Sequence, residues 1–119
     1  MSNANLKKYL PLVRLLSRKN LTREFFTAVV QSLDEPAIKF LCECVKNSTS
    51  TQYVSQLDEK KKKRFLKKIL PNRKILKRLC RKVKHYSQHK NLLIQKGYGI
   101  IIPILSAVAP LIASLLASR

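Results

Sequence analysis

Acidic side chains are confined to the first half of this chain. All six of them lie at or before Glu59, whereas the stretch from Lys60 to Arg119 carries seventeen Lys or Arg and no carboxylate. The first 59 residues hold eight cations and six anions, which gives 8 − 6 = +2, so nearly all of the net charge of +19 belongs to the second half. A charge field of this kind needs a polyanion as partner.

Charge divides the chain into three regions: a nearly neutral N-terminal region (1–56), a basic module (57–96) with sixteen cations, and an apolar tail (97–119) whose charged side chain is Arg119. Without the last two regions, only about 55 residues remain for a conventional core, which is marginal. Two glycines, no Trp and abundant Leu, Lys and Ile favour helix over sheet. We expect an all-α chain with a short N-terminal helical bundle, cationic amphipathic helices and a C-terminal apolar helix.

The N-terminal region has apolar residues at helical spacing. The pattern predicts a first helix from about Leu6 to Ser17, in which Pro11 either introduces a kink or marks the true first turn. Asn20 or Thr22 is placed to cap a second helix. The run Asp34–Pro36 combines an acidic cap, a carboxylate and a proline, which is typical of a helix start. Three such helices suit a small bundle or a protein-interaction module.

The basic module begins after a Ser/Thr/Asn-rich break at 47–52 and predicts two cationic helices. The first runs from Leu57 to Leu70, and Pro71 ends it or opens the next one. The second runs from Asn72 to about Gln88 with one apolar stripe. The cations that we expect to contact a polyanion are Lys60, Lys61, Lys62, Lys63, Arg64, Lys67, Lys68, Arg73, Lys74, Lys77, Arg78, Arg81, Lys82 and Lys84.

Lys and Arg that neutralise phosphates release condensed counterions, so binding is sequence-tolerant and salt-sensitive. With about ten cations on phosphate, log K would fall with log salt at a slope near −9. The pattern favours sequence-nonspecific binding of nucleic acid, and charge alone does not separate DNA from RNA. For a single run such as Lys60–Lys63, a solvated face or a nuclear-localisation patch is the simpler interpretation.

Enzymatic chemistry has no support in the pattern. No carboxylate pair near a histidine and no Gly-rich phosphate loop is present, so we expect neither catalysis nor a cofactor. Cys42 and Cys44 form a C-x-C without a second pair, and with Cys80 they suggest reduced, inert thiols rather than a metal site. His85 and His89 have i, i+4 spacing, yet Lys84 and Lys90 flank them, so we expect solvated surface residues and no metal.

The apolar tail offers 22 uncharged residues from Gly97 to Ser118, and about 20 in a helix suffice to cross a bilayer. It is therefore a transmembrane helix candidate, although Pro103 and Pro110 oppose spanning. An interfacial or self-associating peptide is the other interpretation. The tail residues that we expect to contact a membrane or assembly partner are Ile100, Ile101, Ile102, Ile104, Leu105, Leu111, Ile112, Leu115 and Leu116.

The run 92–105, LLIQKGYGIIIPIL, with basic residues before it and Pro110–Ala113 after it, resembles the precursor of the small basic core protein of adenoviruses and its adintovirus and Maverick/Polinton counterparts. Residues 34–46 are similar to the helical leader of the mobile-element versions. The resemblance covers about residues 34–118. It implies a virion core protein that condenses double-stranded viral or mobile-element DNA without sequence specificity. It also implies a location in the virion core or host nucleus, with capsid proteins or membrane contacted through the tail.

The same resemblance implies cleavage by a viral cysteine protease between Tyr98 and Gly99. Gln95 stands where the protease pattern has an aliphatic residue, and a flexible hinge at Gly97 is the alternative. Two other functions remain open: a membrane-active protein whose cations dock on anionic lipid, with membrane association through residues 97–118, and an adaptor built on the N-terminal helices.

Overall fold

The computed structural model describes the backbone of residues 3–18, 20–49 and 57–117, and the side chains of 4–18, 20–49, 57–107 and 109. Within these residues the chain is all-helical and contains no strand, which confirms the all-α prediction. The elements are α1 (Asn3–Leu16), α2 (Arg23–Ser32), α3 (Glu35–Ser48), α5 (Glu59–Ile69), a 3₁₀ turn η1 (Leu70–Asn72), α6 (Arg73–Cys80), α7 (Ser87–Lys96) and α8 (Tyr98–Ala117).

Side-chain caps fix the starts of three helices. The Thr22 hydroxyl accepts a hydrogen bond from the amide of Phe25 at 3.1 Å, and Asp34 accepts one from the amide of Ala37 at 3.0 Å. Asp58 does the same for the amide of Lys61 at 2.8 Å. Each cap satisfies an amide that has no partner within the helix. The predicted starts at Thr22 and Asp34 are confirmed, whereas Asp58 was not foreseen as a cap.

Two sequence predictions about helix limits need correction. Pro11 lies inside α1, which begins at Asn3, so it does not mark the first turn. The helix expected over 72–88 ends at Cys80, where Arg81 adopts an extended conformation, and residues 81–86 form a connecting segment before α7. Helical backbone there would crowd three cations and the β-branched Val83 without a nearby carboxylate, so local propensity does not sustain the helix.

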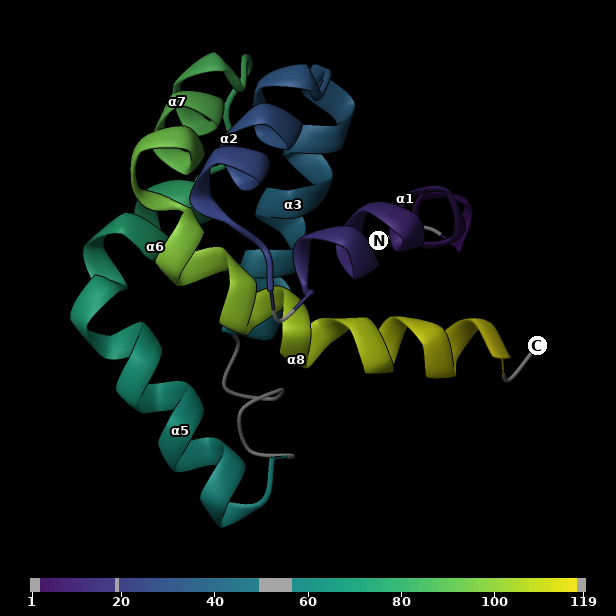
Figure 1. The fold of residues 1–119 in the computed structure, drawn as a ribbon, viewed down its shortest axis with the longest axis vertical. Coiled ribbons are helices and arrows are strands. Elements are labelled where there is room, and N and C mark those ends of the chain that lie inside the picture. The colour runs from purple at the N-terminus through teal and green to yellow at the C-terminus, as the bar shows by residue number, and fades with distance from the viewer. Residues whose placement is uncertain (1–2, 19, 50–56, 118–119) are drawn as a thin grey trace.

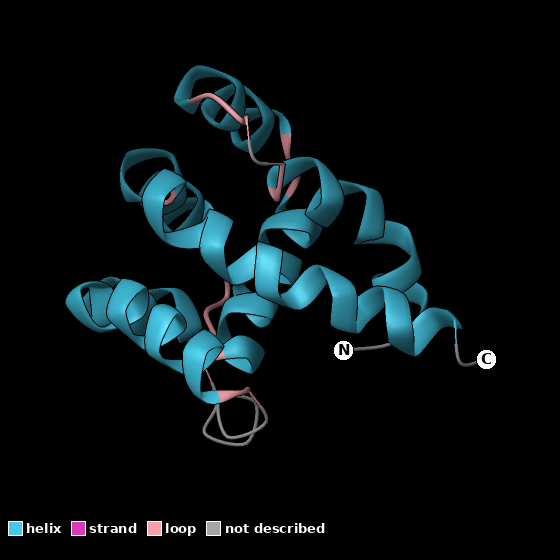
Figure 2. Ribbon diagram, turned by 60° about the horizontal axis from the view of Figure 1, so that its bottom comes forward, coloured by secondary structure: helices cyan, strands magenta, loops and turns pink. Residues whose placement is uncertain are grey.

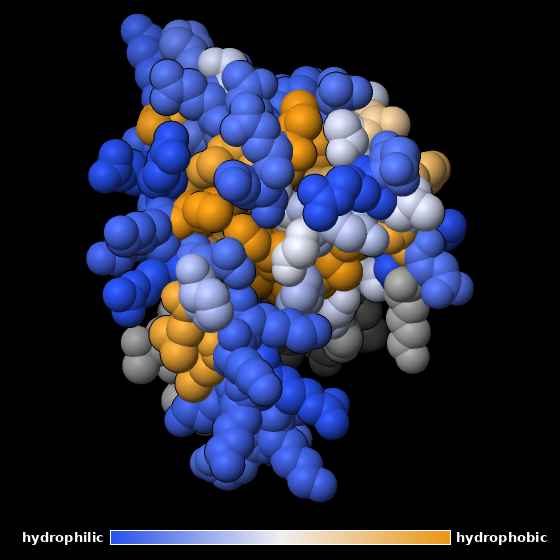
Figure 3. Space-filling view, turned by 60° about the vertical axis from the view of Figure 1, so that its left-hand side comes forward, coloured by the Kyte–Doolittle hydropathy of each residue, from blue (hydrophilic) through white to orange (hydrophobic). Residues whose placement is uncertain are grey.

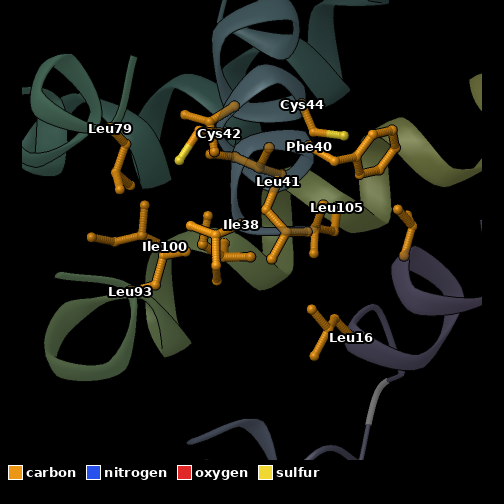
Figure 4. Packing of buried hydrophobic residues seen from close by; sticks show 14 of the residues in the cluster. Leu16, Ile38, Phe40, Leu41, Cys42, Cys44, Leu79, Leu93, Ile100 and Leu105 are labelled. Atoms are coloured by element: carbon orange, nitrogen blue, oxygen red, sulfur yellow. The ribbon is translucent and has the colours of Figure 1, made fainter. Parts of the chain in front are cut away.

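One hydrophobic cluster joins all three sequence regions (Figure 4). Helix α3 supplies most of its centre with Ile38, Phe40 and Leu41, and Figure 4 shows Leu105 of α8 beside them. Leu79 of α6 and Leu93 of α7 are also fully buried. A single core that draws on every helix removes far more apolar surface from water than the N-terminal region could alone.

Helix α8 runs through the middle of this arrangement and then extends alongside α1 (Figures 1 and 2). Its first turns bury Ile100, Ile101, Ile104 and Leu105 against the bundle. Two hydrogen bonds join α7 and α8 to the residues that flank α2. The Lys90 ammonium donates to the carbonyl of Leu33 at 2.9 Å, and the Tyr98 hydroxyl donates to the carbonyl of Leu21.

Candidate nucleic-acid interface

The fourteen predicted contact cations lie on the surface. Thirteen of them are exposed, and Lys62 is half-buried. They occupy α5, α6 and the connecting segment 81–86. The nearest acidic side chains in sequence, Asp58 and Glu59, stand at the first turn of α5, where Asp58 is engaged as the N-cap. The positive field over the rest of this surface is therefore not compensated along the chain.

Helix α5 lies at the periphery of the fold (Figure 1). It buries only Phe65 and Ile69, which are four residues apart and so lie on one face of the helix. The other faces carry Lys60, Lys61, Lys63, Arg64, Lys67 and Lys68, all of them exposed. Phe65, Ile69 and the half-buried Leu66 thus attach the helix to the core, and most of its remaining surface is cationic.

Helix α6 presents Arg73, Lys77 and, just beyond its end, Arg81 at intervals of four residues. These three cations line a groove of about 350 Å³ whose apolar lining includes Ile69, Leu70 and Leu76. An open hollow at the corner between α5 and α6 is lined by Lys67, Arg73 and Lys74, among others. Figure 3 views the molecule from this side: hydrophilic side chains cover most of the face and flank a band of apolar ones.

Large apolar side chains are exposed beside these cations. Leu70, at the turn between α5 and α6, is 54% exposed, and Val83 in the connecting segment is 36% exposed. Val83 belonged to the apolar stripe predicted for a continuous helix, and the early end of α6 places it outside the core. The candidate interface is therefore cationic, with Leu70 and Val83 as separate exposed apolar side chains.

His89 was expected to be a solvated surface residue, and this prediction is wrong. It is buried, packs edge-on against Tyr86 and donates from Nε2 to the carbonyl of Arg81 at 3.0 Å. His85 is exposed, as expected. Because α6 ends before residue 81, the two histidines no longer share one helical face, and the sequence spacing carried no signal of this role.

Burial raises the pKa of all three cysteine thiols. Desolvation raises the pKa of Cys42 and of Cys44 to about 12, with smaller contributions from Glu43 and neighbouring thiols. It also raises the pKa of the half-buried Cys80, against the lowering effects of a hydrogen bond from Thr49 and the charge of Lys46. Thiols held in the neutral form are poor nucleophiles and poor metal ligands. All three are free cysteines.

The junction between α7 and α8 is a packed corner. The Gly97 amide donates to the carbonyl of Leu93 at 2.8 Å, and a Cβ at Gly97 would collide with that same carbonyl oxygen. Tyr98 packs edge-on against Phe26, and Gly99 is exposed in the first turn of α8. The predicted cleavage site thus lies where the chain is held by contacts from α2 and α7.

Among the tail residues predicted to contact a membrane or partner, Ile100, Ile101, Ile104 and Leu105 are buried in the core, and Ile102 is half-buried. This corrects the prediction that these side chains are available for such contacts. Their apolar character reflects packing against α1, α3 and α7. The side chains of Leu111, Ile112, Leu115 and Leu116 lie outside the described residues.

Within the described residues, no helix combines the length and the apolar character needed to cross a membrane. The side chains of residues 108 and 110–119 lie outside the described residues, so the transmembrane prediction for the apolar tail stays a prediction.

Comparison with known proteins gives no relative: no protein-family model, no curated protein and no solved structure matches the chain.

Proposed function

We propose that the protein binds nucleic acid, with double-stranded DNA as its principal partner, and condenses it by sequence-nonspecific neutralisation of phosphates. The observation that carries this proposal is the exposure of thirteen cations on α5, α6 and residues 81–84, with no carboxylate in the chain after Glu59. A surface of this kind attracts phosphate arrays over several ångströms and releases counterions on contact.

Charge density supports neutralisation over specific readout. The steps from Arg73 to Lys77 to Arg81 are four residues each, about 6 Å per helical step and about 12 Å in total. A duplex carries one charge per about 1.7 Å, hence about seven charges over that distance. Phosphates outnumber the facing cations, so every cation finds a partner without a required register.

The supply of base-reading side chains is small. Asn72 is the one amide side chain between Lys60 and Lys84, and its Nδ2 donates to the carbonyl of Lys68 at 3.1 Å. Bidentate readout of adenine relies on Asn or Gln aimed into a groove. With its amide engaged locally, the interface favours contacts to the backbone of the polymer.

The test is binding to unrelated duplexes of equal length over about 0.05 to 0.2 M salt. We expect equal affinities and a log–log slope of about −9 if ten cations engage phosphate. Replacing Arg64, Lys67 and Lys68 by Gln should reduce the slope by about 3. The matched control replaces Lys7, Arg14 and Arg18, exposed cations of the N-terminal region, with the same loss of charge.

Equal slopes for the two triple variants would overturn the proposal, because binding would then depend on total charge and not on this surface. A strong preference for one duplex sequence would also count against it.

The same proposal extends to a place in a virion core of a virus or mobile element, with processing by a viral cysteine protease between Tyr98 and Gly99. Its support is the sequence resemblance. Mass spectrometry of the protein from native particles tests both parts, and an intact chain found outside DNA-containing particles would contradict them. Because the junction is packed, we expect cleavage of the isolated protein to be slow unless the core opens.

A second candidate function, docking on anionic lipid, is favoured by the exposed Leu70 and Val83 among the cations. Co-sedimentation with phosphatidylserine and phosphatidylcholine vesicles tests it. If lipid is the partner, Leu70→Ala and Val83→Ala should weaken binding to the anionic vesicles, whereas Phe25→Ala, an exposed apolar change on α2, should not. Unchanged vesicle binding in both variants would reject this candidate.

A further inference from the structure

A second hollow lies where α1, α3, the end of α6 and the connecting segment 81–86 meet. It is a cavity of about 320 Å³, and the side chains that set its chemistry are Lys39, Glu43 and Lys46 of α3, Arg81 and Lys82, and Tyr86. The fourteen cations predicted from the sequence include only two of these. Lys39 and Lys46 belong to the nearly neutral N-terminal region, where charge composition gives no hint of an anion site.

The lining carries four cations and one anion, which leaves 4 − 1 = +3. Lys39 and Lys46 are seven residues apart, two turns along α3, and so share a face of that helix. Arg81 and Lys82 approach from the connecting segment that follows α6. All four cations are exposed at the rim, and Glu43 is half-buried between the two lysines in sequence. A single carboxylate cannot neutralise this set, so an anion in the cavity meets a net positive surface on two sides.

The backbone that carries Arg81 is fixed from both directions. Its amide donates to the carbonyl of Arg78 at 3.2 Å, which ends α6. Its carbonyl accepts from Nε2 of the buried His89 at 3.0 Å. The backbone of Arg81 therefore has a defined position, and it carries a planar guanidinium whose donors match a phosphate in bidentate geometry. Arg81 also lines the groove along α6, so the cavity and the cationic surface are continuous.

We infer that this cavity binds a phosphate-bearing anion about as large as one nucleotide, held by Lys39 and Lys46 on one side and by Arg81 and Lys82 on the other. A bound water takes about 30 Å³ of liquid volume, and pockets for small organic ligands begin near 300 Å³. The space therefore exceeds a lone inorganic ion. Leu79, Cys42 and Tyr86 give it an apolar wall for a non-charged part of the ligand.

The phosphate in the cavity could belong to a strand of bound nucleic acid, and in that case the inference rests on the proposed function. The other source is a free nucleotide, which the same lining accepts whether or not the protein condenses DNA. If it is a strand, the interface extends from α6 onto α3 and engages the N-terminal region directly.

The test uses the full chain and ¹H–¹⁵N spectra recorded with three probes: pyrophosphate, deoxythymidine monophosphate and a short DNA duplex. We expect pyrophosphate to shift the amides around Lys39, Lys46 and Arg81 saturably. The variant Lys39→Gln/Lys46→Gln should weaken this binding at least about tenfold, since charge-assisted hydrogen bonds are lost. The matched control, Arg14→Gln/Arg18→Gln, removes two exposed cations outside the cavity and should leave the affinity unchanged.

Displacement of pyrophosphate by the duplex would assign the cavity to a strand phosphate, and displacement by the mononucleotide alone would assign it to a free nucleotide. Both results support the cavity. Shifts spread evenly over α5 and α6, or equal affinities in the two double variants, would overturn it. These outcomes are independent of the salt slope of DNA binding, so failure of one proposal is distinguishable from failure of the other. Circular dichroism of each variant confirms folding, because the exchanged side chains are exposed.

Discussion

Helices α5 and α8 are the two extremes of composition in this chain, and the fold uses them in opposite ways. Helix α5 carries exposed cations on most of its surface and buries only Phe65 and Ile69, with the half-buried Leu66 packed beside them. Helix α8 has no charged side chain and gives Ile100, Ile101, Ile104 and Leu105 to the core. One helix is an attached arm, and the other is a central support for α1, α3 and α7. The apolar segment therefore packs within the protein, whereas the cationic segment faces its surroundings.

Truncation of a buried side chain in α8 should give the largest effect. Ile104→Ala removes a fully buried isoleucine and should cost about 2–5 kcal/mol of unfolding free energy, because a cavity remains. Ile102→Ala on the same helix is the control, since Ile102 is half-buried and should cost much less. Urea denaturation measures both. Equal losses would break the comparison by showing that the face of α8 does not matter.

High pH should weaken the core that α3 forms with α8. An unfolded thiol ionises near about 8.5, while burial holds the pKa of Cys42 and Cys44 at about 12. Below pH about 8.5 both states keep their protons, and above it the unfolded state loses protons that the folded state retains, so stability falls as pH rises toward 12. The expected slope is at most about 1.4 kcal/mol per pH unit for each thiol. The double variant Cys42→Ala/Cys44→Ala should lose less stability than the natural protein between about pH 9 and about pH 10.5, in the lower half of this window. An unchanged slope of unfolding free energy against pH would contradict this prediction.

The two glycines at the start of α8 should respond with opposite signs. Gly97→Ala would bring a methyl group against the Leu93 carbonyl and should cost about 1–3 kcal/mol. Gly99→Ala meets nothing within 4 Å in a helical position and should stabilise by about 0.4–1 kcal/mol. Thermal denaturation of both variants tests the pair. A neutral Gly97→Ala would mean that the corner between α7 and α8 is looser than its contacts imply.

The smallest effects on stability should come from the helix caps. They distinguish the peripheral helix α5 from the core helix α3. Asp34→Ala and Asp58→Ala each remove a side-chain cap worth about 1 kcal/mol. Asp34 caps a core helix, so its loss should shift the global urea midpoint. Asp58 caps the peripheral α5, so its loss should mainly accelerate amide exchange at Lys61 and Lys62. Similar midpoint shifts for the two variants would place α5 within the cooperative core.

Local signals in the sequence predicted the helix class and several starts well. Thr22 and Asp34 act as caps because their effect depends on the next three residues alone. The early end of α6 and the burial of His89 were not predictable in this way. Both depend on α7 folding back toward α6, a tertiary contact that periodicity does not encode.

The cations of the interface were predictable as a set, because exposure follows from unpaired charge. Their partners on α3 were not, since Lys39 and Lys46 look ordinary among nearby acids until the fold brings Arg81 and Lys82 to the same cavity. The burial of the first turns of the apolar tail was not predictable for a similar reason. A run of uncharged residues has the same composition whether it faces lipid or a protein core, and only the position of α8 between α1 and α3 distinguishes them.

The packing of α8 against α1 and α3 also fixes the order in which the protein is completed. A ribosome releases the first three helices early, then α5 and α6, and α8 only afterwards. Until α8 emerges, the apolar faces of α1 and α3 lack their main cover while the full cationic load is already outside the exit tunnel. Under the proposed function, the nascent chain would meet nucleic acid before it has finished folding.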